Sequence, residues 1–188
     1  MERHPTLLRR DDSVLVVVDA QESLLPILHG SDALLANLLL LCRSAAILGV
    51  PVLATTQYAA RLGPTVAPIA EALAEAGSPE PFDKLSFSCA GSEAFVAALA
   101  ATGRRQVVLC GAETHICVSQ TAHDLKHAGY AVHVVADAVS SRTLERHKLG
   151  MERIRDGGIL PCAAEAAVYE WMQVAGTPEF KAILKMVR

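Results

Sequence analysis

The segment SVLVVVDA (13–20) is a continuous apolar run, rich in valine, that ends in an aspartate and an alanine. Runs without polar alternation are typical of strands in a parallel sheet, because helices cover both faces of such a sheet. Two further segments, VPVLATTQ (50–57) and RQVVLCGA (105–112), have a similar character. These three segments predict a buried parallel sheet at the centre of the fold.

Helix-like segments alternate with these strands along the chain. The segment 31–49, for example, opens with a capping-type serine and ends at a glycine, as helices often do. The alternation predicts one domain over residues 1–188, with a three-layer α/β/α fold and a mostly parallel, doubly wound sheet of about six strands. Further strands are expected over 130–138 and 159–162, and 83–89 is ambiguous between strand and loop. The helices are expected over 31–49, 65–77, 92–103, about 115–128, 143–158 and 164–176.

The composition limits the kinds of binding partner and the cellular compartment that we expect for this chain. The chain has 52% hydrophobic residues and a net charge of only -3, without a basic block, so neither nucleic acid nor an anionic membrane is expected as a partner. The first residues, MERHPTLLRRDD, are charged and do not resemble a secretory signal. The 5 cysteines, an odd number without a C-x-x-C pair, favour free thiols in a reducing compartment. We therefore expect a cytoplasmic protein without disulfides.

Residues whose side chains could take part in catalysis or binding follow several of the expected strands. Asp19 closes the first, Gln57 ends the second, and the segment 111–117 with Cys117 follows a central one, while Lys84 lies in the ambiguous segment. In parallel sheets, ligands bind outside the carboxyl ends of the strands. Taken singly, each residue has a more common explanation: Asp19 as a cap, Lys84 as a surface charge, and Cys117 as a small buried hydrophobe.

Together, the same residues indicate nucleophilic catalysis. A thiol at a helix N-terminus, with an ammonium close by, would have its thiolate form favoured. A carboxylate across the site could take the thiol proton and return it to a leaving group. Gly111 allows a sharp turn, so that backbone amides can point at a developing oxyanion. The sequence alone does not show that Asp19, Lys84 and Cys117 meet.

Three longer motifs resemble those of a known family. The resemblance implies that Asp19, Lys84 and Cys117 meet in one site. VVVDAQE (16–22), PFDKLSFSC (81–89) and LCGAETHICVSQTAHDL (109–125) resemble the motifs of the isochorismatase-like cysteine hydrolases, with ADAVSSRT (136–143) as a further similar segment. TTQYAARLGPTV (55–66) and GTPEFKAILK (176–185) are most similar to the subgroup called isochorismatase domain-containing proteins.

The resemblance implies specific roles and a similar parallel fold. It implies a catalytic triad of Asp19, Lys84 and Cys117, and a cis peptide bond between Ala112 and Glu113. The backbone N–H groups of Glu113 and Cys117 would hold the oxyanion. It further implies a small-molecule substrate and a homo-oligomer, either a dimer or a tetramer.

The chain also departs from one branch of this family. Nicotinamidases carry an aspartate and two histidines after the second strand, which hold a metal, whereas this chain has TTQYAARLGPT there. We therefore expect neither a metal nor another cofactor. The residues near the motifs that are candidates for the pocket lining are Gln21, Gln57, Tyr58, Phe87 and His115. For Phe82 and Phe87 core packing is the favoured interpretation, and His115 is either a wall residue or a subunit contact.

The function expected is a metal-independent cysteine hydrolase that cleaves the C–N bond of a small amide through a thioester. Two alternatives stay open. One is hydrolysis of a vinyl ether, as in the isochorismatases, and the other is a non-catalytic binding or scaffold protein that keeps the fold. A redox-sensing thiol is a lesser option, because it would need a resolving cysteine near Cys117.

Overall fold

The computed structural model describes residues 3–187, and its centre is a six-stranded sheet with the order β3-β2-β1-β4-β5-β6. Every neighbouring pair of strands is parallel. The order therefore reverses between β1 and β4, which is the position where doubly wound sheets open a crevice for ligands. The strands are β1 (Ser13–Val18), β2 (Val52–Gln57), β3 (Phe82–Lys84), β4 (Gln106–Ala112), β5 (Ala131–Ser140) and β6 (Leu160–Cys162).

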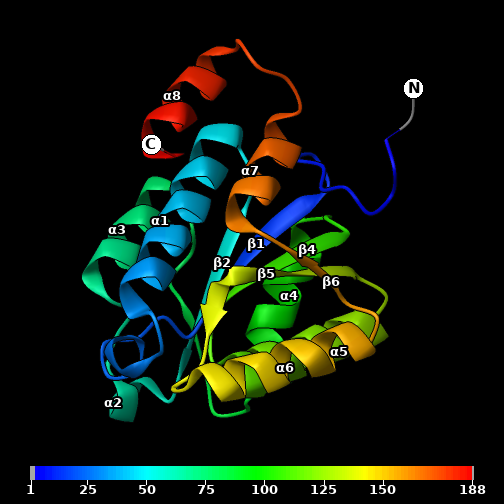
Figure 1. Cartoon of the computed structure of the whole chain (residues 1–188). Coiled ribbons are helices and arrows are strands. Elements are labelled where there is room, and N and C mark those ends of the chain that lie inside the picture. Colours follow the sequence, from blue (N-terminus) through cyan, green and yellow to red (C-terminus); the bar gives the residue numbers. More distant parts are fainter. Residues whose placement is uncertain (1–2, 188) are drawn as a thin grey trace.

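Helices cover both faces of the sheet, as Figure 1 shows. One layer contains α1 (Ser31–Leu48), α3 (Ala67–Glu75), α7 (Ala164–Met172) and α8 (Pro178–Val187). The opposite layer contains α4 (Glu93–Ala101), α5 (Ser119–His127) and α6 (Leu144–Asp156). Shorter helical turns lie in the loops: η1 (Leu25–Ile27), α2 (Ala59–Leu62), η2 (Cys89–Gly91) and the π-helical turn η3 (Thr114–Val118).

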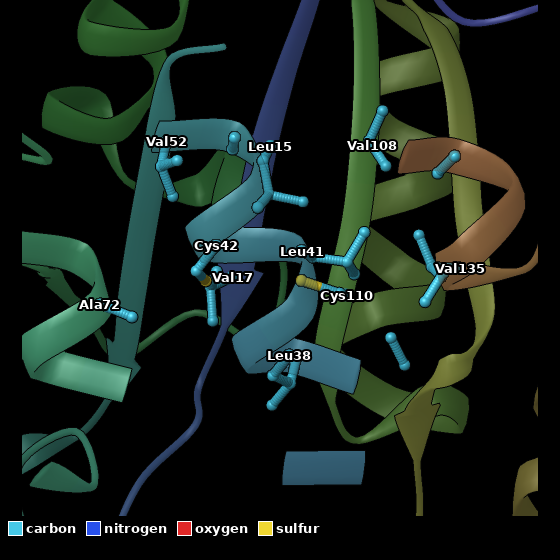
Figure 2. Packing of buried hydrophobic residues seen from close by; sticks show 14 of the residues in the cluster. Leu15, Val17, Leu38, Leu41, Cys42, Val52, Ala72, Val108, Cys110 and Val135 are labelled. Atoms are coloured by element: carbon cyan, nitrogen blue, oxygen red, sulfur yellow. The ribbon is translucent and has the colours of Figure 1, made fainter. Parts of the chain in front are cut away.

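Strand alternation divides the core into two clusters. In β1, Leu15 and Val17 face the α1 layer, whereas Val14, Val16 and Val18 face the α4–α6 layer. Figure 2 shows the first cluster, in which Leu15 and Val17 lie together with side chains from α1. In a strand that is buried on both faces, successive side chains all pack against apolar layers, so polar residues are disfavoured. This explains why β1 reads as an unbroken apolar run.

Gly111 allows β1 and β4 to approach closely at the point where the strand order reverses. It is paired with Val18 across the β1–β4 ladder and has a φ of +110°. A Cβ atom at this position would lie 2.0 Å from the carbonyl oxygen of Val18. Only glycine fits here, because any side chain would push apart the two strands that flank the crevice.

The three-layer fold predicted from the sequence is confirmed, and the sheet is parallel throughout. The segment 83–89, which the sequence leaves ambiguous between strand and loop, is mostly loop: only Phe82–Lys84 pairs with β2, and a 3₁₀ turn begins at Cys89. The expected helix from about 115 begins instead with η3, and α5 follows at Ser119. Helix α8 was not expected.

Helix α1 is long and apolar enough to cross a membrane by length and composition alone. In the structure its buried side chains, including Leu34, Leu38 and Leu41, belong to the first core cluster. It also contacts α3, α7, α8 and β5. Its apolar composition is therefore explained by core packing.

Candidate active site

Asp19 directly follows β1 at the crevice and its side chain is fully buried. Its backbone has a φ of +50°, in the left-handed region that aspartate tolerates better than most residues. One carboxylate oxygen, Oδ1, accepts a hydrogen bond of 2.7 Å from the Thr55 hydroxyl on β2. The other, Oδ2, lies 2.8 Å from Nζ of Lys84 on β3. Strand ends that are distant in sequence thus meet at this carboxylate.

Lys84 is the last residue of β3, and its side chain is also fully buried. An ammonium group has three hydrogens to donate. The Nζ atom donates to Asp19 Oδ2 at 2.8 Å, to Gln57 Oε1 at 2.8 Å and to the Phe87 carbonyl oxygen at 3.2 Å. The ammonium is therefore neutralised by one carboxylate, and three acceptors match its three hydrogens.

Cys117 lies in η3, between β4 and α5, and is only 6% exposed. Its Sγ is 3.9 Å from Oε1 of Gln57, the same oxygen that accepts from Lys84. Burial and the negative charge of Asp19 raise the pKa of Cys117 to about 12, and Lys84 lowers it by less. Asp19, Lys84 and Cys117 thus converge in one site.

This protonation state corrects one expectation. The sequence predicted a thiolate favoured by a helix N-terminus and a lysine. The structure instead gives a neutral thiol at ordinary pH, because the pKa of Cys117 is raised to about 12. The physical reason is that Lys84 is already paired with Asp19, so its positive charge does not offset the burial of the sulfur.

Gln57 and Gln21 have different roles although both were candidates for substrate contact. Gln57 is partly buried and places its amide oxygen between Lys84 and Cys117. Gln21 is fully buried, and its amide bonds the backbone N–H and carbonyl of Gln57 and the carbonyl of Gly63. The structure does not support substrate contact for Gln21. Its geometry is that of a residue that positions Gln57.

Tyr58 and Phe87 flank the site and are exposed, by 45% and 55% of their surface. The core packing favoured for Phe87 is therefore wrong, whereas Phe82 does pack on Phe95 in the second core cluster. Phe87 leaves the core because the chain after Lys84 is a loop and not a continued strand. Leu85, which we had not singled out, is 72% exposed and bonds Gln57 through its carbonyl oxygen.

The turn between β4 and η3 contains the peptide bond between Ala112 and Glu113, which is cis. Within residues 3–187, no backbone acceptor is hydrogen-bonded to the N–H of Glu113. The Glu113 carboxylate is turned toward Arg142, with its backbone N–H at 2.8 Å and its Nε at 3.2 Å. The Glu113 side chain is thus paired elsewhere, and its backbone N–H remains available to a ligand.

His115 is partly buried in η3, and its Nδ1 lies 2.9 Å from the Ser141 hydroxyl. Burial lowers its pKa below the ordinary value. Its backbone contacts Gly150 of α6 so closely that an added Cβ would lie 2.8 Å from His115 Cα. Helix α6 therefore supports the segment that carries Cys117.

In the described residues, no group of three or more histidine, cysteine, aspartate or glutamate side chains is arranged to hold a metal ion.

The family model described as the isochorismatase domain matches residues 13–166, from β1 into α7. The chain belongs to the isochorismatase family. It is a hydrolase of this family, and the resemblance stated from the motifs is confirmed.

Curated relatives and a solved structure agree with this assignment. The secreted isochorismatase effector Isc1 of Phytophthora sojae is 41% identical over 94% of this chain and 84% of its own length. The isochorismatase domain-containing protein 2 of Danio rerio is 36% identical over 93% of this chain and 86% of its own length. The structure of MAR1 ribonuclease from Caenorhabditis elegans, 32% identical, superposes with a TM-score of 0.89 over 96% of this chain and 92% of that one.

Proposed function

We propose that this isochorismatase-family hydrolase cleaves the C–N bond of a small amide, without a metal, through a thioester on Cys117. One observation carries the proposal. A thiol, a carboxylate and an ammonium from three separate strand ends lie in a single buried site and interact with one another. A cysteine with a carboxylate and an ammonium close enough to shift its pKa has the surroundings of a nucleophile that a general base can activate.

The first half of the reaction forms the thioester. Sγ of Cys117 attacks the amide carbon as Asp19 takes the thiol proton, and the backbone N–H groups of Glu113 and Cys117 hold the oxyanion. Lys84 stabilises the carboxylate of Asp19 before the transfer and the negative charge near the sulfur during it. The tetrahedral intermediate then breaks its C–N bond, and ammonia or an amine leaves with the proton from Asp19.

The second half restores the enzyme. Water attacks the thioester carbon while Asp19 takes its proton, and the C–S bond breaks to release a carboxylic acid. The sulfur recovers a proton from Asp19, so that the neutral thiol returns. A resting thiol with a pKa raised to about 12 needs a base at the moment of attack, and Asp19 is placed to supply it.

A screen of small amides tests this proposal. Wild type should release ammonia or amine and accumulate a mass increment on Cys117 that equals the acyl group. Cys117→Ala should lose both signals, whereas Cys162→Ala, which alters a thiol at the far β6 edge of the sheet, should keep them. Amide hydrolysis that survives Cys117→Ala would refute the nucleophile assignment.

The names of two relatives suggest other activities, ether hydrolysis by an isochorismatase and RNA cleavage by a ribonuclease. The same screen separates them, because neither reaction forms an acyl-enzyme on Cys117. Isochorismate and a short single-stranded RNA therefore belong in the screen beside the amides. Turnover of either one without an acyl-enzyme would favour that activity. If none of these substrates is turned over, a non-catalytic binding protein becomes the better interpretation.

The cellular setting belongs to the same proposal. We propose a cytoplasmic homo-oligomer, supported by free buried thiols and by large exposed apolar residues such as Leu149 on α6. Light scattering of the purified chain measures the assembly directly.

A further inference from the structure

The floor of the candidate site offers no free positive charge to a ligand. The three hydrogens of the Lys84 ammonium match three acceptors, one of which is the Asp19 carboxylate. Both side chains are fully buried. A substrate carboxylate that approached Lys84 would have to displace Asp19 or Gln57 and would also meet the negative charge of Asp19. Binding of an anion at this floor is therefore unfavourable.

Three large apolar side chains are exposed beside this floor, and hydrogen bonds tie their backbones to its polar residues. The carbonyl oxygen of Phe87 accepts from Lys84 at 3.2 Å, and that of Leu85 accepts from Gln57 at 3.0 Å. The backbone N–H of Tyr58 donates to the Lys84 carbonyl oxygen at 2.9 Å. We call Tyr58, Leu85 and Phe87 the apolar rim. Its surface would be removed from water if a ligand at Cys117 carried an apolar group.

On the η3 side, Arg142 is already paired. Its Nε lies 3.2 Å from the carboxylate of Glu113, which is itself almost completely buried. Recruiting this guanidinium to a substrate would leave the buried Glu113 carboxylate with only the backbone N–H of Arg142, which is costly. Arg142 therefore does not compensate for the lack of a free cation at the floor.

We infer that the site selects uncharged carbonyl compounds that carry an apolar group, and that it disfavours substrates with a carboxylate. This inference rests on the proposed function, because it names the substrate class for the same nucleophile. The preferred substrates are neutral aliphatic or aromatic amides. A dicarboxylate, whatever the bond to be cleaved, is a poor fit to this site.

Alkylation of Cys117 tests the inference without turnover. Iodoacetamide and iodoacetate differ by one charge, and each forms an S–C bond as iodide leaves and the thiol proton is lost. Rates at Cys117 are followed by peptide mass and divided by the rates of the same reagents with glutathione. We expect the corrected preference for iodoacetamide to be about tenfold or more. Equal corrected rates would overturn the inference, as would an iodoacetate rate that falls in Arg142→Gln.

A longer reagent tests the rim. N-hexyl iodoacetamide should react about three to ten times faster than iodoacetamide, because its chain covers apolar surface. Leu85→Ser and Phe87→Ser should each lower the ratio of the N-hexyl iodoacetamide rate to the iodoacetamide rate, and this ratio is taken within each variant. The bonds to Lys84 and Gln57 use backbone atoms and are kept in both variants. The matched control is Val174→Ser, a 62% exposed residue between α7 and α8. An advantage that survives both rim variants would contradict the role of the rim.

Turnover then separates this inference from the proposed function. Hexanamide should be hydrolysed with a kcat/KM about tenfold above that of adipic acid monoamide. Hydrolysis of both at equal kcat/KM would keep the amidase proposal and refute the selectivity. Absence of any amide hydrolysis, together with the expected alkylation pattern, would refute the amidase proposal and retain the selectivity of the site.

Discussion

Two buried thiols of this molecule, Cys110 and Cys117, have different surroundings. Cys110 lies in β4 and contacts the first core cluster, where burial raises its pKa and the other thiols Cys42 and Cys162 raise it further. Cys117, a few residues later on the same segment, is also buried and its pKa is also raised. Their neighbours differ: Cys110 donates to a backbone carbonyl, whereas Cys117 interacts with a carboxylate, an ammonium and an amide.

Burial and a raised pKa are therefore common to the proposed nucleophile and a core residue, and neither one distinguishes the two. Both thiols are neutral at ordinary pH. What distinguishes Cys117 is a base within reach that can accept its proton at the moment of attack.

The largest effect is expected from the matched pair Cys117→Ala and Cys110→Ala. Loss of the nucleophile should reduce kcat/KM about 10⁴-fold or more, with the melting temperature little changed. Cys110→Ala should lower the free energy of unfolding by about 1–2 kcal/mol and leave kcat/KM near that of wild type. Steady-state kinetics and thermal denaturation of both variants measure this. Equal losses of activity would show that the two thiols do not differ as described.

Asp19→Asn should change hydrolysis and the alkylation of Cys117 in opposite directions. Hydrolysis should fall about 10²- to 10⁴-fold because the base is lost. The negative charge of Asp19 raises the pKa of Cys117, so its removal should lower that pKa. Alkylation of Cys117 at pH 8–9 should then become faster, while Cys110 is unaffected. A slower alkylation of Cys117 would contradict the electrostatic account of its neutral thiol.

His133 on β5 is a buried titratable group without the partners that the site supplies. Its Nε2 has no hydrogen-bond partner, and burial lowers the pKa of His133 from 6.5 to about 4. In the unfolded chain, His133 therefore binds a proton below pH 6.5. In the folded chain it binds that proton only below about pH 4. Stability is full above pH 6.5 and is expected to fall by about 2–3 kcal/mol as the pH drops to 4.

Denaturant unfolding of wild type and His133→Leu over this pH range measures that loss. Carboxylates also titrate near pH 4, so the difference between the two proteins is the relevant quantity. The variant should lack this part of the pH dependence. If the free energy of unfolding changed equally with pH in both proteins, His133 would not be the cause of the pH dependence.

The smallest effect is expected at Gly150, which supports the nucleophile segment from α6. A methyl group there would press on His115 at 2.8 Å and shift η3. Gly150→Ala should reduce kcat about tenfold, because small displacements of a nucleophile are costly. Reactivity of Cys117 with iodoacetamide should fall in parallel, whereas the core thiols are unaffected. A wild-type kcat would show that α6 does not position the site.

Much of the architecture could be predicted because its causes are local. Unbroken apolar runs identify strands buried on both faces, and glycines and capping residues mark the helix ends. Asp19 and Lys84 end β1 and β3 or directly follow them, and Cys117 follows β4, so the parallel topology brings them to one edge. The existence of the cluster thus follows from strand order, once the order is known.

Other features depended on contacts that no local pattern reveals. The burial of Gln21, the exposure of Phe87 and the neutral state of Cys117 are set by neighbours from distant strands. Thr55 was visible only as part of a strand end, although its hydroxyl holds Asp19. The pairing of Lys84 with Asp19 decides whether the thiol is ionised, and pairing is a property of the assembled sheet.

The strand order β3-β2-β1-β4 has a consequence for how activity arises during synthesis and refolding. The groups proposed for catalysis lie on or beside β1, β3 and β4, so no fragment that lacks one of these strands can be active. The nucleophile stays without its base until long-range pairing is complete, which is a slow event in parallel sheets. Recovery of hydrolysis after dilution from denaturant should therefore lag behind recovery of helical circular dichroism and report the closing of the sheet.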